Sequence, residues 1–320
     1  MPTLKHTLAK LIARTRPTLF YYRAPAERRR GIRVRKIGDR LEVIRDETRQ
    51  IVRIGAGNAV HLPDMIESFD YYAASADPVA IRQGDAIYAL TDFSTPRLHH
   101  VSGFDDFAVL CPSSTEPFST TAQYLDFAAI RPGSVVIDLG AYSGLTAIAF
   151  SKAAGPTGRV IALEPDPMNF RAAAYNLATH ARVNGLDNIT LLPWAASDAD
   201  GQMAMSSEGT MGSALVSIVG GYRGATVSVE ARTLDSIARH HELAAVDFVK
   251  IDIEGAEEMV VRASSAFLAK YRPRLLIEGH LVNGVSTIPP ITAFLEANGY
   301  ACEVVSQEGL TFSLVQARPV

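Results

Sequence analysis

The stretch "VVIDLGAYSGLTAIAF", residues 135–150, decides the fold class of this chain. Its opening residues, Val135 to Ile137, are apolar without alternation, which is typical of a strand buried on both faces of a parallel sheet. Gly140 and Gly144 follow in a turn where backbone can approach another group closely. The residues after Gly144 resume with helical spacing. Strand, glycine turn and helix in this order indicate an α/β fold with a ligand site at the turn.

The same alternation continues toward the C-terminus. After a helix at 116–130, we predict strands at about 134–139, 159–163, 189–193, 247–252 and 274–278, with helices between most of them. This order favours a doubly wound, mostly parallel sheet. The segment "YACEVVSQEGLTFSLVQ", residues 300–316, instead predicts two strands around a Glu-Gly turn. The last strand is therefore expected to run antiparallel to its neighbour.

Composition limits the class of protein. The chain has 320 residues, 48% of them hydrophobic and 20% charged, which is ordinary for a globular protein with ample core. We expect no transmembrane segment, because no apolar run approaches the ~20 residues that span a bilayer, and the N-terminus does not resemble a secretory signal. Cys111 and Cys302 are too few for a disulfide framework or a cysteine metal site. These features predict a cytoplasmic protein.

Basic residues are concentrated at the N-terminus. Residues 1–53 hold 15 Lys and Arg against 5 Asp and Glu, a balance of +10, whereas the remainder holds 16 against 29, a balance of −13. The run "RRRGIRVRK", residues 28–36, can contact an anionic surface such as a peripheral membrane face, or it can be a solvated extension. Leu4, Leu8, Leu11 and Ile12 predict a short amphipathic helix. We divide the chain into a basic arm with a small α+β region, 1–110, and the α/β domain that holds the glycine turn, 111–320.

The glycine turn does not have the composition of a dinucleotide loop. A G-x-G-x-x-G loop approaches a pyrophosphate three times, whereas here one glycine is missing and Asp138 precedes the turn. A carboxylate at this place repels pyrophosphate and suits a ligand with positive charge. Glu164 ends the second strand, where an acid accepts hydrogen bonds from both hydroxyls of a ribose. A cationic ligand with a ribose and no pyrophosphate indicates S-adenosylmethionine.

Four segments carry a resemblance to a known family. They are "VIDLGAYSGLTAIAFSK", "GRVIALEPDPMNF", "LLPWAASDADG" and "VDFVKIDIEGAE", the last followed by "RPRLLIEGH". Over residues 115–305 the chain resembles the FkbM family of class I S-adenosylmethionine-dependent methyltransferases. The resemblance implies a Rossmann-like sheet of seven strands with an antiparallel last strand. In the glycine loop, Ala141-Tyr142-Ser143 departs slightly from the residues that the family often carries there.

The resemblance also implies roles for individual residues. The amino-acid end of the cofactor is expected near the first strand and its turn, at Asp138, Gly140, Tyr142 and Gly144. Glu164 is expected at the ribose, and Asp252, at the end of the fourth strand, beside the sulfonium. Asp198 falls where the class places an acid or amide for adenine, although a turn residue is an equally good interpretation.

Methyl transfer to a hydroxyl benefits from a base that removes the proton. His280 and Glu278 follow the fifth strand beside the expected cleft, so His280, Glu278 or Asp252 can be the catalytic base; a histidine here can also be structural. Lys250, inside a buried strand, needs a carboxylate partner. Glu254 is expected to open the next helix. The sequence assigns no metal ligands.

The leading hypothesis is an O-methyltransferase that acts on a hydroxyl of a sugar, glycan or natural-product acceptor. The glycine- and hydroxyl-rich loop at Ser206–Ala214 can offer hydrogen bonds to such an acceptor, or it is only a connection. One alternative is an RNA-binding protein or RNA methyltransferase that uses the basic N-terminal arm, although the arm has few stacking aromatics. Another is an interaction protein that binds no cofactor.

Overall fold

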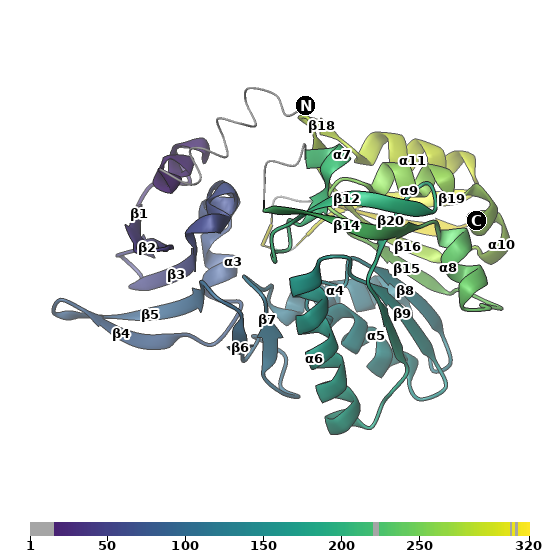
Figure 1. The fold of residues 1–320 in the computed structure, drawn as a ribbon, viewed down its shortest axis with the longest axis horizontal. Helices are drawn as coiled ribbons and strands as arrows, with labels where there is room; N and C mark the ends of the chain where they lie inside the picture. Colours follow the sequence, from purple (N-terminus) through teal and green to yellow (C-terminus); the bar gives the residue numbers. More distant parts are fainter. Residues whose placement is uncertain (1–15, 220–223, 308, 311–312) are drawn as a thin grey trace.

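The computed structural model describes residues 16–219, 224–307, 309–310 and 313–320 (Figure 1). The amphipathic helix expected near Leu4–Ile12 lies outside the described residues. Within them, no helix has the length and apolar character required to cross a membrane.

A seven-stranded sheet forms the centre of the molecule (Figure 1). Its spatial order is β10-β9-β8-β15-β16-β20-β19. The first five strands are mutually parallel, and β20 runs antiparallel to both of its neighbours. The strands are β8 (Val135–Leu139), β9 (Arg159–Leu163), β10 (Ile189–Leu192), β15 (Phe248–Ile251), β16 (Arg274–Gly279), β19 (Tyr300–Ser306) and β20 (Ser313–Pro319). The predicted doubly wound sheet, its strand positions and its antiparallel last strand are confirmed.

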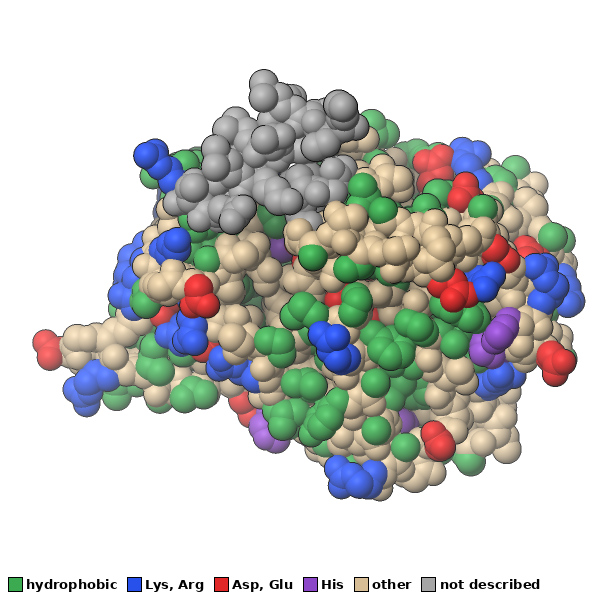
Figure 2. Space-filling model, viewed as in Figure 1, with side chains coloured by type: hydrophobic (Ala, Val, Ile, Leu, Met, Phe, Trp, Pro, Cys, Tyr) green, Lys and Arg blue, Asp and Glu red, His purple; other side chains and the backbone are tan. Residues whose placement is uncertain are grey.

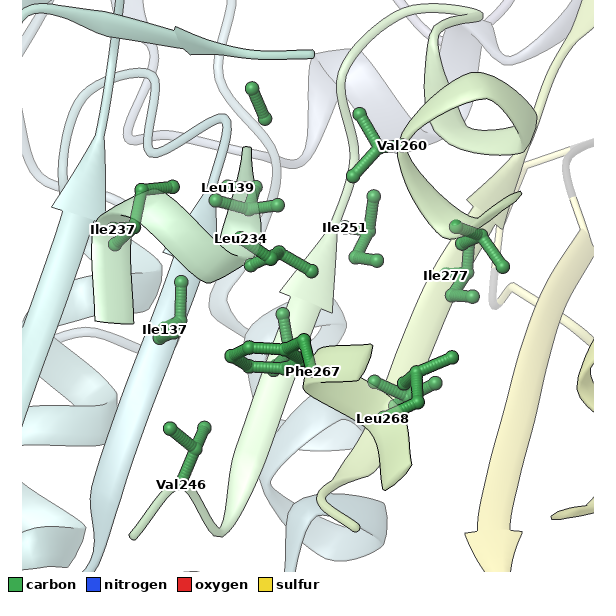
Figure 3. Packing of buried hydrophobic residues seen from close by; sticks show 14 of the residues in the cluster. Ile137, Leu139, Leu234, Ile237, Val246, Ile251, Val260, Phe267, Leu268 and Ile277 are labelled. Atoms are coloured by element: carbon green, nitrogen blue, oxygen red, sulfur yellow. The ribbon is translucent and has the colours of Figure 1, made fainter. Parts of the chain in front are cut away.

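Alternating side chains of these strands bury both faces of the sheet. Ile137 and Leu139 of β8 belong to a cluster with residues of the helices on one face, shown in Figure 3. Val136, the residue before Ile137, packs on the opposite face. The first face is covered by α8 (Leu234–His240), α9 (Glu257–Ala263), α10 (Ser265–Tyr271) and α11 (Ile288–Ala297), and the second by α4 (Phe118–Ala128), α5 (Leu145–Ala154) and α6 (Pro167–Asn184). Apolar runs without alternation follow from this burial on both faces.

Smaller elements lie beyond the carboxyl ends of the parallel strands. A four-stranded sheet has the order β11-β14-β12-β13, and a two-stranded hairpin follows β16. These elements are β11 (Trp194–Ala196), β12 (Gly201–Ser207), β13 (Ala214–Leu215), α7 (Val216–Val219), β14 (Ala225–Arg232), β17 (Leu281–Val282) and β18 (Val285–Ser286).

The N-terminal part has a sheet and a core of its own, beside the central sheet in Figure 1. Its order is β1-β2-β3-β5-β4, with β3 and β5 parallel and the other pairs antiparallel. Its elements are η1 (Pro17–Arg23), β1 (Ile32–Ile37), β2 (Arg40–Arg45), β3 (Gln50–Gly55), η2 (Ala56–His61), α2 (Leu62–Glu67), α3 (Phe69–Ala73), β4 (Val79–Gln83) and β5 (Ala86–Phe93). We call residues 16–93 the N-terminal unit. A hairpin of β6 (Arg97–His99) and β7 (Val109–Cys111) spans residue 110, and the boundary there stays a prediction.

Many basic side chains of the N-terminal unit are paired inside it. Figure 2 shows Lys and Arg side chains at the left of the molecule with Asp and Glu among them. Arg33 donates two hydrogen bonds to Asp46, and Arg35 contacts Glu42, which is fully buried. The guanidinium of Arg29 lies over the rings of Tyr21 and Tyr22. Part of the basic run therefore stabilises its own sheet.

Candidate active site

A cavity of about 650 Å³ opens at the carboxyl ends of the parallel strands. This is the size of a small-molecule site, and the location is the one that open α/β sheets use for ligands. Three parts of the chain line it: the tips of the central strands, the loop before β13, and the N-terminal unit.

The glycine turn after β8 brings backbone to the edge of the cavity. Gly140 has a φ of +82°, and a Cβ at this position would lie 1.9 Å from the carbonyl oxygen of Asp252. Gly144 has a φ of +83° and precedes α5, but it lies outside the cavity lining; a Cβ there would meet Leu177 at 2.5 Å. Gly140 is thus required by the approach of the β8 and β15 tips, and Gly144 by the packing of α6.

A buried ion pair joins these two strand tips. Asp138 and Lys250 are register partners on β8 and β15, and Lys250 Nζ lies 3.4 Å from Asp138 Oδ1 and 3.3 Å from Asp252 Oδ2. The same ammonium donates to the Gly140 carbonyl at 2.7 Å. Burial alone lowers the pKa of Lys250, but the two carboxylates outweigh it and raise this pKa. The expected carboxylate partner of Lys250 is therefore present.

Asp138 supports the site without lining it. Its side chain is fully buried, and Thr146 donates a hydrogen bond to Oδ2 at 2.6 Å. Burial raises the pKa of Asp138, while Lys250 and Thr146 oppose that rise. In the structure Asp138 contacts Lys250 and Thr146 at the start of α5, and its predicted contact with the cofactor stays a prediction.

Glu164 follows β9 and is buried against the glycine turn. Its Oε2 accepts from the backbone of Tyr142 at 2.8 Å, and its Oε1 accepts from the backbone of Asp166 at 2.9 Å. Burial raises the pKa of Glu164 to about 8. Glu164 and Tyr142 both line the cavity, as expected, and the Tyr142 hydroxyl donates to the Ser114 carbonyl at 2.7 Å.

Asp252, Glu278 and His280 converge at the tips of β15 and β16. His280 Nε2 lies 4.0 Å from Asp252 Oδ1 and 3.8 Å from Glu278 Oε1, and all three residues line the cavity. Burial lowers the pKa of His280, but neighbouring carboxylates, Glu257 first, raise it well above its usual value. Burial, followed by the charge of Asp252, raises the pKa of Glu278 well above its ordinary range.

Two acids near this cluster differ from expectation. Glu254 does not open a helix: it has a φ of +58° in the loop before α9 and lines the cavity. Glu257, which the sequence analysis did not single out, is the first residue of α9 and is fully buried. Its Oε1 accepts from the backbone of Ile253 and Gly255 and lies 3.0 Å from His280 Nδ1. Glu257 is the last residue of the segment "KIDIEGAE", which the sequence analysis quoted, and its place in that segment could have marked it as a site residue.

Asp198 lies away from the site. It is exposed on the turn after β11 and is absent from the cavity lining, so the structure does not support the predicted adenine contact. The turn-residue interpretation fits better, because Ser197 Oγ donates to its carboxylate within that turn. Trp194 and Ala195 of β11 line the cavity instead.

The loop between β12 and β13 forms one wall of the cavity. Asp166 anchors it, accepting from the backbone of Glu208 and Gly209 at 3.1 Å and from Ser213 Oγ at 2.7 Å. Glu208 also contacts His61 of the N-terminal unit at 2.8 Å. The loop is thus tied both to the central sheet and to the N-terminal unit.

Residues before the central sheet supply a wall that the sequence did not predict. Asp64 and Tyr72 of the N-terminal unit line the cavity, as does Glu116 in the segment before α4. Burial, followed by the charge of Asp252, raises the pKa of Glu116 to about 7. These positions are far from the strand tips in sequence, and no local pattern marks them.

The sheet order, the glycine turn and the acid after the second strand together define a class I S-adenosylmethionine-dependent methyltransferase. A family model described as the methyltransferase FkbM domain matches residues 138–302, which is 165 of the 320 residues. The chain belongs to the FkbM methyltransferase family, and its cofactor is S-adenosylmethionine. The absence of a side chain at Gly140 and the buried carboxylate of Glu164 fit this cofactor.

Solved structures show remote similarity. The precorrin-6y C5,15-methyltransferase of Geobacter metallireducens is 18% identical, with a TM-score of 0.41, 64% of this chain covered and 90% of that one. Methyltransferase FkbM of Methylobacillus flagellatus has the same identity and TM-score, with 57% of this chain covered and 43% of that one. The fibrillarin of Aeropyrum pernix, with bound S-adenosyl-L-methionine, is 12% identical, with a TM-score of 0.39 and 89% and 98% covered. No curated protein matches the chain. The assignment rests on the family match and the strand order.

Proposed function

We propose that the protein transfers a methyl group from S-adenosylmethionine to a hydroxyl oxygen of a sugar, glycan or other polyhydroxylated natural product. The observation that carries the proposal is the convergence of Asp252, Glu278 and His280 beside the glycine turn. Proton-accepting groups at this place suit an acceptor that must lose a proton as it is methylated.

The residues around the glycine turn would hold the donor. Glu164 would accept hydrogen bonds from the ribose hydroxyls, while Gly140 leaves room for the amino-acid end. Asp138 acts through Lys250, which fixes the β8 and β15 tips relative to each other. When bound, the cofactor supplies an electrophilic methyl group on a sulfonium. The contribution of the chain is to hold the acceptor oxygen in line with it at reacting distance.

The wall opposite the strand tips suits a neutral, hydroxyl-rich acceptor. It offers amide, carboxylate and hydroxyl groups together with the ring of Tyr72; the polar groups include Asn58, Asp64, Ser113, Thr115, Thr210 and Ser213. Among the described lining residues, six carboxyl groups stand beside Arg23, Lys250 and His280, whose pKa is raised. A wall rich in carboxyl and hydroxyl groups and poor in arginine and lysine offers little to bind phosphate, which favours a glycan over RNA. The division into a basic α+β region, 1–110, and a methyltransferase domain, 111–320, is part of this proposal.

Methyl-labelled S-adenosylmethionine tests the acceptor class. The full chain would be incubated with glycan fractions, lipid extracts and RNA, and we expect label in a glycan or glycoside that withstands alkali and nuclease, as a methyl ether does. Label that nuclease releases from RNA would contradict the proposal. So would calorimetry that detects no binding of S-adenosylhomocysteine, which is the outcome that the cofactor-free interaction hypothesis requires.

A variant pair identifies the catalytic cluster. His280→Ala is expected to slow transfer by about 10²-fold or more while S-adenosylhomocysteine binds as in the parent. Glu258→Gln is the matched control, because Glu258 lies on α9 and pairs with Arg262 at the surface. Equal rates for His280→Ala and the parent would remove this residue from the chemistry.

A further inference from the structure

Three side chains of the active-site cavity have metal-binding atoms close to one another. The atoms are Asp252 Oδ1, Glu278 Oε1 and His280 Nε2, which come from the tips of two adjacent strands. One ligand atom from each of the three residues lies within 4.8 Å of the other two, and His280 Nε2 is 4.0 Å from Asp252 Oδ1 and 3.8 Å from Glu278 Oε1. Around one ion bound at about 2.0–2.2 Å, ligand atoms lie about 3–4 Å apart, so a small inward shift would bring all three to an ion.

A separate partner holds the other polar atom of each side chain. Lys250 Nζ lies 3.3 Å from Asp252 Oδ2, and the Tyr124 hydroxyl donates to Glu278 Oε2 at 3.4 Å. On the imidazole, Nδ1 lies 3.0 Å from Oε1 of Glu257. Metal-binding side chains are typically oriented in this way, with a carboxylate on the far nitrogen of the histidine. These three contacts involve residues outside the triplet and orient it before any ion arrives.

Carboxyl groups around Asp252, Glu278 and His280 also favour the binding of a cation. Glu257 is fully buried, and its Oε2 accepts no hydrogen bond from the described residues. Glu254 Oε1 lies 3.8 Å from His280 Nε2, so four carboxyl groups surround one imidazole. Lys250 is the nearby ammonium among the described residues, and it is already shared between Asp138 and Asp252. A fully buried carboxylate such as that of Glu257 is stabilised by a proton or by a cation nearby.

We propose that Asp252, Glu278 and His280 form a binding site for one divalent cation of the Mg²⁺ or Mn²⁺ type. Two carboxylate oxygens and one imidazole nitrogen suit Mn²⁺, and open positions would remain for water or an acceptor oxygen. Resting on the proposed function, the ion would bind the acceptor hydroxyl and lower its pKa, as metals do for bound water. His280 would then be a ligand of the ion.

Titration with Mn²⁺ alone tests the site in the full chain without any acceptor. Loss of the free-ion signal in electron paramagnetic resonance is expected to show one Mn²⁺ per chain. Pulsed measurements on the bound ion should detect ¹⁴N coupling from one imidazole. Asp252→Asn, Glu278→Gln and His280→Gln should each weaken binding by about tenfold or more, the last also removing the ¹⁴N coupling. Glu164→Gln, another cavity carboxylate, and Glu258→Gln, a surface one, should bind Mn²⁺ as the parent does.

The outcomes separate this proposal from the proposed function. A parent chain that binds no Mn²⁺, or binds it without ¹⁴N coupling, overturns the metal site, and this result needs no variant to fold. Binding that persists in all three cluster variants overturns it too. Methyl transfer that continues unchanged in chelator-treated protein would leave the methyltransferase standing without the ion. Stoichiometric Mn²⁺ binding without methyl transfer to any hydroxyl would support the metal site and contradict the proposed function.

Discussion

At the residue scale, the site depends on one buried ammonium. Lys250 lies opposite Asp138 in the sheet register, contacts Asp252 and donates to the Gly140 carbonyl, so it joins the tips of two strands. A buried charge of this kind is tolerated only when its partners are in place. The sequence indicated that Lys250 needed a carboxylate, because a lysine stood within an apolar strand. Which carboxylates pair with Lys250 could be determined only from the register of β8 and β15 in the sheet.

Replacing Glu164 tests the ribose contact. Glu164→Gln keeps the shape of the side chain but removes the charge that strengthens its hydrogen bonds, which is worth about 1.5–3 kcal/mol. We therefore expect S-adenosylhomocysteine to bind about 10- to 100-fold more weakly in calorimetry. Glu258→Gln on the surface should bind as the parent does. Unchanged affinity in Glu164→Gln would place the ribose elsewhere.

The pH dependence of cofactor binding follows from the same carboxyl group. Burial raises the pKa of Glu164 to about 8, so at pH 6–7 the cofactor-free protein carries it largely protonated. A ribose that donates two hydrogen bonds prefers the ionised form, so binding releases a proton and affinity rises with pH until about 8. Calorimetric titrations of S-adenosylhomocysteine between pH 6 and 8.5 should show this rise in the parent and a flatter profile in Glu164→Gln. Parallel profiles would contradict the assignment.

At the element scale, the approach of the β8 and β15 tips fixes the glycine turn. A Cβ on Gly140 would lie 1.9 Å from a backbone oxygen, whereas Gly155, also at positive φ, has open space around it. Each Ala substitution incurs about 1–3 kcal/mol of backbone strain, and only Gly140→Ala adds a clash. We expect Gly140→Ala to lose at least about 2 kcal/mol more unfolding free energy than Gly155→Ala in denaturant titrations. Equal losses would show that the strand tips separate easily.

The central elements were predictable because their burial is simple. Strands covered on both faces are continuous apolar runs, so their positions could be predicted within a residue or two, and the final hairpin within three residues. Residues 60–110 were harder, since short helices and strands there pack aromatics such as Phe69 and Tyr72 into a mixed core. Glu254 was wrong as a helix opener because Gly255, with a φ of +100°, continues the loop until α9.

The candidate site was predictable only where it follows a strand. Glu164, Asp252, Glu278 and His280 come directly after or at the end of strands, and the structure brings them all to one cavity. Asp198 is placed differently, because the chain after β10 enters β11 of the second sheet, which carries Asp198 to an exposed turn; its contact with adenine stays a prediction. The cavity walls from the N-terminal unit depend on long-range packing that leaves no local pattern.

At the scale of the whole molecule, the cavity is shared between the central sheet and the N-terminal unit. His61 contacts Glu208 at 2.8 Å, and a Cβ on Gly212 would lie 2.4 Å from the His61 ring. This close packing ties the loop at 208–213 to the N-terminal unit. The family match begins at residue 138, so the wall residues that belong to the N-terminal unit lie outside the matched domain.

Hydrogen exchange tests this connection. His61→Gln is expected to raise exchange in the peptide that covers residues 207–213 by about threefold or more, because the loop loses its contact with the N-terminal unit while its anchors on Asp166 and Asn169 remain. Affinity for S-adenosylhomocysteine should remain within about twofold of the parent. The exposed His100→Gln is the matched control and should leave exchange unchanged. Identical exchange in both variants would show that the N-terminal unit does not stabilise the loop.

The crystal structure of the protein with S-adenosylhomocysteine tests the central claim most directly. The account predicts the ribose against the Glu164 carboxylate and the sulfur beside the tip of β15, near Asp252. Electron density for the ligand at another surface would contradict this account. So would an empty cavity in crystals grown with S-adenosylhomocysteine at a saturating concentration.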